Sequence, residues 1–523
     1  MLIDAGALDP DGDVQADVCI VGAGAAGITL AQALIGTAVQ VVVLEGGGMQ
    51  AEDASQQCYA GTSTGEPYYA LDACRVRAFG GTTNTWGGWC RPLDPIDFLE
   101  RDWLPHSGWP FTAEALAPFY ARAHRVCRLA PCADDAGRRP TPGGSLVPPD
   151  STALTDTRFH VGPTRFGHEY KAVLQPAANV RVLLHATACA IEMDPSHRTA
   201  LRLAVAAPGG RRLSVRARAY VLAAGGIETP RLLLASRPGR SPGVGNDHDL
   251  VGRFFTEHLH VPMATLTPAG AAPGFYAVHR AGAATIRGAV SVTDAARQRE
   301  QMLGWALTFH NADDPHDVLS PTRQPPAYES LSVLLHALRR REYPRRLLHH
   351  LGAVAADPRS AGAMAYRKLR PPPARRLMVG CRAEQAPNPD SRVTLDDRVD
   401  AFGVPRVRLH WALTARDRDG IERAAAVWRR ELAAAGAAIG PIGPADEPWT
   451  ARLAPGAHHM GTTRMHADPA RGVVDPDGRV HGTRNVFVTG SSVFPTAGWA
   501  PPTLTIVALA LRLADHLRAG LPR

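Results

Sequence analysis

The sequence predicts an α/β fold with two domains, and patterns at both ends and in the middle of the chain support this prediction. Near the start, an apolar run over residues 17–21 stops at Gly22, passes into a helical pattern and returns to strand composition over residues 39–44. Such a run is typical of a strand that is buried on both faces. The chain is therefore expected to open with a β-α-β unit.

Two later stretches have the same order of strand, glycine and helix. An apolar run at residues 219–224 leads into Gly225 and a helix over residues 229–236. Residues 486–488 lead into Gly490 and a helix over residues 503–517. Parallel sheets are commonly assembled from such units, so these distant stretches are expected to join the opening unit in one sheet.

The pattern changes between about residues 260 and 450 to short strand-like runs and basic helical stretches. We therefore expect a first, discontinuous domain made of residues 1–259 and 450–523. Residues 260–449 are expected to form a second domain with a mostly antiparallel sheet and helices, which covers the first domain and receives a substrate.

Composition excludes several classes of protein. The 523 residues are 45% hydrophobic and 20% charged, which suits a large core and not a disordered or fibrous chain. The 8 cysteines are too irregularly spaced for a disulfide framework or a zinc site, and we predict no metal. Without a signal peptide pattern or an apolar run of about 18 residues, the sequence predicts no integral membrane segment and a cytoplasmic location.

Arginine dominates the basic residues, since only Lys171 and Lys368 are lysines among 57 basic positions, and the formal net charge is +8. Such a charge raises the question of nucleic acid or an anionic membrane. The arginines are scattered among 49 acidic residues, however, and the bias is typical of a GC-rich coding sequence. We expect no nucleic acid partner. The basic cluster within residues 338–376 is interpreted as a solvated helix and loop, with a lid or a weak contact with a membrane surface as the alternatives.

A dinucleotide-binding signature lies between the first strand and the first helix. Gly22 allows a tight turn, Gly24 lets the backbone approach a pyrophosphate, and Gly27 lets the helix pack on the strand. Glu45 ends the next strand, where its carboxylate can accept hydrogen bonds from both ribose hydroxyls. The signature predicts a Rossmann-type domain that binds an adenine dinucleotide, and by itself it leaves FAD and NAD open.

Further stretches resemble the glucose-methanol-choline (GMC) oxidoreductases. Gly80-Gly-Thr-Thr-Asn-Thr-Trp-Gly-Gly-Trp-Cys-Arg-Pro92 is similar to their flavin-contacting loop, and His458-His-Met-Gly-Thr-Thr-Arg-Met465 is similar to their C-terminal segment. Other stretches in family order are residues 223–234, 251–258, 384–393, 490–496 and 502–505. The branch that it most resembles contains the pyranose oxidases and fructose dehydrogenase-like enzymes.

The resemblance implies an FAD-dependent enzyme that oxidises the CH–OH group of a sugar, glycoside or related polyol by hydride transfer to flavin N5. It places the catalytic base at His458, with the neighbouring His459 as the rival. A histidine suits this role because its pKa lies near neutral pH. Oxygen or another carrier is the expected electron acceptor, and the oligomeric state stays open.

The resemblance and the glycine signature together assign the expected FAD contacts. Those residues are Gly22, Gly24, Ala25, Gly27, Glu45, Gly80, Gly81, Thr82, Asn84, Thr85, Trp86, Gly87, Gly88, Gly225, Gly490, Ser491, Pro502 and Thr503. Some relatives attach FAD covalently through a histidine at the position of Thr85. Because threonine cannot form that bond, we predict non-covalent FAD.

A second departure concerns the partner of the base. Many relatives have a His or Asn just before the Pro-Thr that opens the last helix, and here that residue is Pro501. Proline offers neither a side-chain hydrogen bond nor an N–H. The alternatives are therefore a non-redox FAD-containing lyase or an oxidase-like protein with altered chemistry. His258 and His260 are interpreted as structural or pocket-lining residues.

Overall fold

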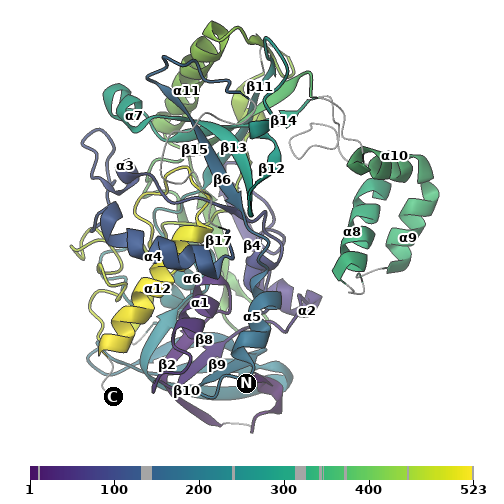
Figure 1. Ribbon diagram of the computed structural model, residues 1–523. Coiled ribbons are helices and arrows are strands. Elements are labelled where there is room, and N and C mark those ends of the chain that lie inside the picture. The colour runs from purple at the N-terminus through teal and green to yellow at the C-terminus, as the bar shows by residue number, and fades with distance from the viewer. Residues whose placement is uncertain are drawn as a thin grey trace.

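The computed structural model describes residues 1–9, 12–130, 144–237, 242–312, 326–340, 344, 347–369, 374–444 and 447–520. Its body is built on two large sheets, one at each end of the molecule in Figure 1. Helices α8 (Pro326–Arg340), α9 (Leu347–Ala356) and α10 (Pro358–Leu369) stand apart from the sheets as a group. Parts of the predicted basic cluster at 338–376 lie outside the described residues.

The first sheet contains the dinucleotide signature, and most of its strand pairs are parallel. Its strand order is β1-β7-β3-β2-β10-β9-β8, and β20 also pairs with β10. Only the pairs β10–β9 and β9–β8 are antiparallel among the described strands of this sheet. The strands are β1 (Leu2–Asp4), β7 (Val180–Leu184), β3 (Val41–Leu44), β2 (Asp13–Val21), β10 (Arg211–Leu222), β9 (Ala200–Ala207), β8 (Thr187–Met193) and β20 (Val486–Val488).

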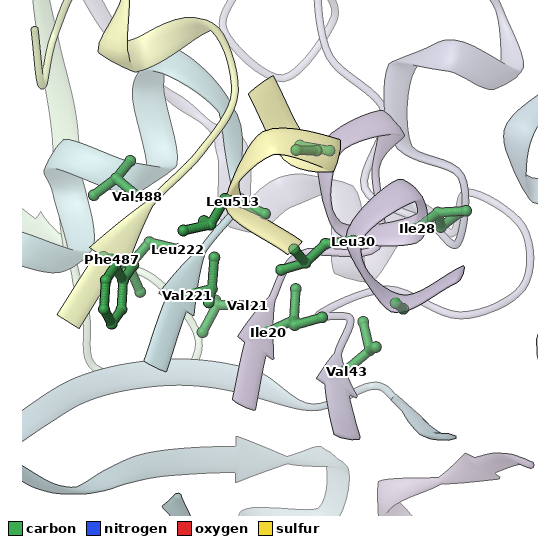
Figure 2. Close-up of a cluster of buried hydrophobic side chains, with 14 of the residues drawn as sticks. Ile20, Val21, Ile28, Leu30, Val43, Val221, Leu222, Phe487, Val488 and Leu513 are labelled. Atoms are coloured by element: carbon green, nitrogen blue, oxygen red, sulfur yellow. The ribbon is translucent and has the colours of Figure 1, made fainter. Parts of the chain in front are cut away.

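Helices α1 (Ala25–Ala33) and α12 (Thr503–Gly520) lie side by side against this sheet, α4 (Ala113–Val126) packs on α12, and α5 (Phe166–Leu174) packs beside α1. Figure 2 shows the core between them, where Ile20 and Val43 from the sheet meet Leu30 of α1 and Leu513 of α12. The apolar run predicted as a strand is buried because helices cover it and strands flank it on both sides.

The second sheet is antiparallel throughout its described pairs, in the order β18-β11-β15-β14-β13-β6-β5, with β12 beside β13 and β19 beside β11. Helix α11 (Ala415–Ala434) packs its buried face on this sheet. The strands are β18 (Ala438–Gly440), β11 (His258–Thr267), β15 (Leu377–Glu384), β14 (Trp305–Asn311), β13 (Ala284–Val292), β6 (Leu154–Val161), β5 (Trp89–Cys90), β12 (Val278–Ala281) and β19 (Ala454–Pro455).

A small third sheet has the order β16-β17-β4. It consists of β16 (Arg392–Val399), β17 (Pro405–Trp411) and β4 (Gly61–Gly65). The remaining helices are α2 (Asp53–Gln56), α3 (Pro95–Phe98), α6 (Gly225–Ala235) and α7 (Asp294–Glu300).

The predicted α/β fold class, with a parallel sheet assembled from distant segments and a mostly antiparallel second sheet, is confirmed. The boundaries at residues 259 and 449 stay a prediction, and the sheets cross them, because β5 and β6 precede residue 260 but pair within the second sheet. Helix α6 begins at Gly225, earlier than predicted, because its φ of 79° lets the chain turn directly out of β10. Within the described ranges, no helix is long and apolar enough to cross a membrane.

A buried ion-pair network ties the loop after β5 to the second sheet. Both carboxylate oxygens of Glu384 are bound, one by Arg101 at 2.6 Å and the other by Arg297 at 3.1 Å. Arg297 also binds Asp97 at 2.6 Å. Burial raises the pKa of Glu384, but the two guanidinium groups overcome this effect and hold it at about 2.

We expect Glu384→Gln to lower the free energy of unfolding by about 3–5 kcal/mol, because it leaves the buried guanidinium of Arg101 without its anion and removes one of the buried carboxylates that bind Arg297. Thermal unfolding followed by circular dichroism would show a lower melting temperature. The matched control is Glu192→Gln, which removes a half-exposed partner of Arg202 and should cost less than about 1 kcal/mol. Equal shifts for the two variants would contradict this account.

Candidate active site

A cavity of about 750 Å³ is lined by residues of both large sheets. One part of its wall is the turn between β2 and α1 with Glu45 of the next strand, and another part contains His458, His459, His260 and Arg382. Sequence segments that were predicted to bind a cofactor and to hold a base therefore line one cavity.

The three glycines of the signature occupy different environments. A Cβ on Gly27 would lie 1.9 Å from the carbonyl oxygen of Gly22, which shows how closely the helix packs on the turn. A Cβ on Gly24 would have no heavy atom within 4 Å, and Gly24 lines the cavity. Helix α1 begins at Ala25 without a side-chain cap, so the amides of its first turn are available to an anion.

Glu45 is buried at the end of β3. Its Oε2 accepts a hydrogen bond from the backbone N–H of Ala23 at 3.1 Å, and its Oε1 accepts one from Gly47 at 2.9 Å. Burial raises the pKa of this carboxyl. Because a carboxylate has about four acceptor positions, Glu45 retains capacity for the hydroxyls of a ribose.

The loop after Phe79 is held from behind by two of its own residues. Asn84 donates to the carbonyl oxygen of Phe79 at 2.8 Å and accepts from the N–H of Gly167 at 3.0 Å. Gly80, with φ of 97°, lies so close to Gly167 that a Cβ would clash. Gly27, Gly80 and Asn84 thus support the cavity wall, whereas the loop residues that line it are Gly81, Thr82, Thr85, Trp86, Gly87 and Gly88.

Two helix starts complete this part of the wall. Gly225 opens α6, and Thr503 opens α12 directly after Pro502. Gly490 and Ser491 also line the cavity, and the hydroxyl of Ser491 donates to the carbonyl oxygen of His459 at 2.6 Å. The cofactor part of the cavity is therefore tied to the histidine pair through backbone contacts.

His458 faces a histidine from the second sheet. Its Nδ1 lies 2.8 Å from Nδ1 of His258, whose Nε2 lies 2.9 Å from the carbonyl oxygen of Gly498. Burial lowers the pKa of His258 to about 4, so its ring is neutral. A carbonyl oxygen only accepts, so His258 carries its proton on Nε2 and accepts at Nδ1. This network assigns the proton of His458 to Nδ1 and a free lone pair to Nε2.

His459 has a different environment. Its ring stacks on Phe255 with centroids 6.1 Å apart, and its Nε2 lies 3.7 Å from Sγ of Cys74 and 4.0 Å from Oε1 of Glu257. Burial lowers its pKa to about 3. Its backbone carbonyl lies against Gly226, where a Cβ would come within 2.3 Å of it. Both histidines line the cavity, but His459 is held among protein groups on several sides.

Glu257 lies behind both histidines and is fully buried. Its Oε2 accepts from the backbone N–H groups of His258 at 3.1 Å and His458 at 2.9 Å. Its Oε1 accepts from the hydroxyl of Tyr68. Burial raises its pKa to about 7, above the ordinary value for a glutamate. The carboxylate fixes the backbone that presents His458.

The structure adds residues that sequence reasoning did not assign to the reaction. His258 and His260 are two apart on β11, so their side chains share a face of the sheet, and that spacing was the available signal. Arg382 pairs with His260 across β11 and β15 and lines the cavity together with Trp89. Pro501 also lines the cavity. His258 thus gives His458 a hydrogen-bond partner that does not come from position 501.

Family comparisons agree with this geometry. Residues 17–388 match the family described as "FAD dependent oxidoreductase", and residues 387–510 match the one described as "GMC oxidoreductase". Because the first match spans more than half of the chain, the protein belongs to the FAD-dependent oxidoreductases. Within that class it is a GMC oxidoreductase, as the motifs predicted.

Individual relatives have low sequence identity to this chain. The chain is 27% identical to 6'''-hydroxyparomomycin C oxidase of Streptomyces lividus over 96% of this chain and 92% of the relative. It is 25% identical to the fructose dehydrogenase large subunit of Gluconobacter japonicus over 66% of this chain and 56% of the relative. The crystal structure of pyridoxine 4-oxidase from Mesorbium loti has a TM-score of 0.56 and 18% identity over 97% of this chain and 100% of that chain, which shows a shared fold.

The cavity fits FAD. Open space over Gly24, the uncapped start of α1 and the acceptor capacity of Glu45 suit the pyrophosphate and ribose of a dinucleotide. Thr85 is exposed and its hydroxyl donates to the carbonyl oxygen of Thr82 at 3.2 Å. In the described part of the chain, no cluster of three or more His, Cys, Asp or Glu side chains is placed to hold a metal.

We expect Gly24→Ala to fold normally but to bind FAD about tenfold more weakly or worse, since its methyl group would project where the pyrophosphate approaches. The control is Gly27→Ala, whose methyl group would clash with the turn. Unlike Gly24→Ala, this variant should lower the melting temperature as well as the FAD content. FAD released by acid precipitation gives the cofactor content, and the melting temperature of cofactor-free protein gives the fold. A normal FAD content in Gly24→Ala would contradict the assignment, and colour left on the precipitate would contradict non-covalent binding.

Proposed function

We propose that this protein oxidises a CH–OH group of a sugar, glycoside or related polyol, with His458 as the catalytic base and non-covalent FAD as the oxidant. The observation that carries the proposal is the 2.8 Å contact between Nδ1 of His458 and Nδ1 of His258, which leaves Nε2 of His458 to act as the base, in a cavity that fits FAD. When bound, FAD supplies the hydride acceptor at flavin N5. The relatives named for paromomycin and fructose support a polyhydroxylated substrate.

In the proposed reaction, Nε2 of His458 takes the proton of the substrate hydroxyl as the hydride leaves its carbon. The resulting imidazolium is stabilised because its Nδ1–H points at the neutral ring of His258. His258 in turn is held by the carbonyl oxygen of Gly498. Glu257 keeps the backbone of His458 in place. The electron acceptor that reoxidises the flavin is proposed to be oxygen or another carrier.

The lyase alternative rested on the absence of a hydrogen-bonding residue at Pro501. His258 provides a hydrogen-bond partner to His458 from β11, in place of the one that Pro501 lacks. This contact supports oxidation over a non-redox reaction. The two reactions differ in a simple observable, because only oxidation bleaches the flavin when alcohol is added without oxygen.

We expect His458→Ala to slow anaerobic flavin reduction by about a hundredfold to ten-thousandfold, the usual contribution of a general base. Stopped-flow absorbance with a panel of sugars, glycosides and cyclitols measures this rate. The control is His459→Asn, which should retain FAD and keep most of the rate. If His459→Asn lost the activity and His458→Ala kept it, the base would be His459. If the wild-type flavin stayed oxidised across the panel, the proposed function would be wrong.

We expect His258→Phe to lower kcat by about tenfold to a hundredfold with little change in KM, because the buried Nδ1–H of His458 loses its acceptor. His258→Asn should restore part of the rate, since an amide oxygen can accept the same hydrogen bond. Steady-state kinetics separates kcat from KM, and FAD content shows that the variants fold. A larger effect on KM than on kcat, or no difference between Phe and Asn, would exclude a role in orienting the base.

A further inference from the structure

Arg382 contributes a guanidinium group to the same cavity as His458. Residue 382 lies in the middle of β15, and its Nη1 donates to Nε2 of His260 at 3.0 Å. The guanidinium also lies 4.3 Å from the ring centroid of Trp89. All three residues line the cavity. A cation is thus presented to the substrate space by an aromatic ring and a histidine.

Among the described residues, no carboxylate forms an ion pair with this cation, whereas the buried Arg75 and Arg231 both bind Glu228. Burial and the nearby Arg287 lower the pKa of Arg382 to about 9, which leaves the group charged at neutral pH. Burying a charge without a partner is costly. An anionic ligand would offset that cost.

The carboxylates that line the cavity are already bound elsewhere. In the described chain they are Glu45, Glu228 and Asp400. Glu45 accepts from two backbone N–H groups, Glu228 binds two arginines, and Asp400 binds Arg231 at 2.7 Å. None of them is a partner of Arg382, so no carboxylate of the cavity wall in the described chain neutralises its charge. A substrate that carries an amine would be repelled there, and one that carries an oxyanion would be attracted.

The distances allow one small molecule to reach both Arg382 and the base. His260, which accepts from Arg382, has its ring centroid 6.0 Å from that of His458. Both rings lie against Gly456, where a Cβ would come within 3.0 Å of His458 and 3.2 Å of His260. Because guanidinium presents parallel N–H groups, it can bind an oxyanion in two contacts and orient the rest of the molecule.

We propose that Arg382 is a specificity-determining residue, and that the substrate is a polyhydroxylated molecule carrying an oxyanionic group, a carboxylate or a phosphate, which Arg382 binds while a hydroxyl faces His458. This inference rests on the proposed oxidation and names its substrate class. A sugar acid such as a glycuronide has the required chemistry, since it has ring hydroxyls and a carboxylate on one small frame.

The test uses the FAD-loaded enzyme and matched substrates that differ at one carbon. Methyl β-glucoside is compared with methyl β-glucuronide, and methyl β-galactoside with methyl β-galacturonide. Methyl β-glucoside 6-phosphate separates a phosphate from a carboxylate, and methyl β-glucosaminide supplies a cation. Anaerobic flavin reduction gives the rate constants, and isothermal titration calorimetry gives the affinities. We expect the anionic member of at least one pair to be favoured by about tenfold to a hundredfold in kcat/KM.

Arg382→Gln should remove that preference, and Arg382→Lys should keep part of it. The matched control is Arg287→Gln, because Arg287 also stacks on Trp89, at 4.9 Å, but does not line the cavity. It should keep the preference. FAD content shows that each variant folds.

The outcomes separate this inference from the proposed function. If neutral glycosides reduce the flavin as well as their anionic partners do, the role of Arg382 is wrong and the oxidation of polyols stands. If Arg382→Gln slows neutral and anionic substrates equally, Arg382 supports the fold or the flavin, and the inference also fails. If no member reduces the flavin, the proposed function fails and this inference fails with it.

Discussion

The active site depends on the carboxylate of Glu257, which joins segments 201 residues apart in the chain. One oxygen holds the backbone N–H groups of His258 and His458, and the other holds the hydroxyl of Tyr68. A buried carboxyl without these donors would cost several kcal/mol, so the three segments must close together. Where they close, β11 of the second sheet brings His258 to His458, and the cavity becomes one space.

Burial of the histidines decides which of their atoms is reactive. The neutral ring of His258 donates its one N–H to the carbonyl oxygen of Gly498 and accepts a hydrogen bond from Nδ1 of His458. This arrangement leaves the lone pair of His458 on Nε2. The same low-dielectric surroundings strengthen the field of Arg382. In the reaction and substrate class that we propose, His258 orients the base and Arg382 binds the charge of the substrate, and both side chains come from the second sheet.

Local sequence was a good guide to the cofactor part of the site. Gly22 and Gly24 act through the backbone of a single turn, so strand, glycine spacing and helix were enough to predict their positions. The same reasoning did not show which of the predicted residues line the cavity and which support its wall. Asn84 and Gly80 do not line the cavity but pack against Gly167 of α5. That contact joins segments far apart in the chain, and no local pattern encodes it.

The sequence by itself determined the β-α-β unit, the class of cofactor, the family and His458 as the candidate base, because each follows from contiguous residues or from a motif. Only the tertiary structure decided that His258 replaces the partner missing at Pro501, and that Arg382 stands beside His260. The contact of Arg382 with His260 depends on the antiparallel register of β11 and β15, where a shift of one residue would turn every side chain to the opposite face. The contact of His258 with His458 depends on the pairing of β11 with β19, which directly precedes the histidine pair. Register is set by packing across the whole sheet, and for that reason it could not be read from either strand alone.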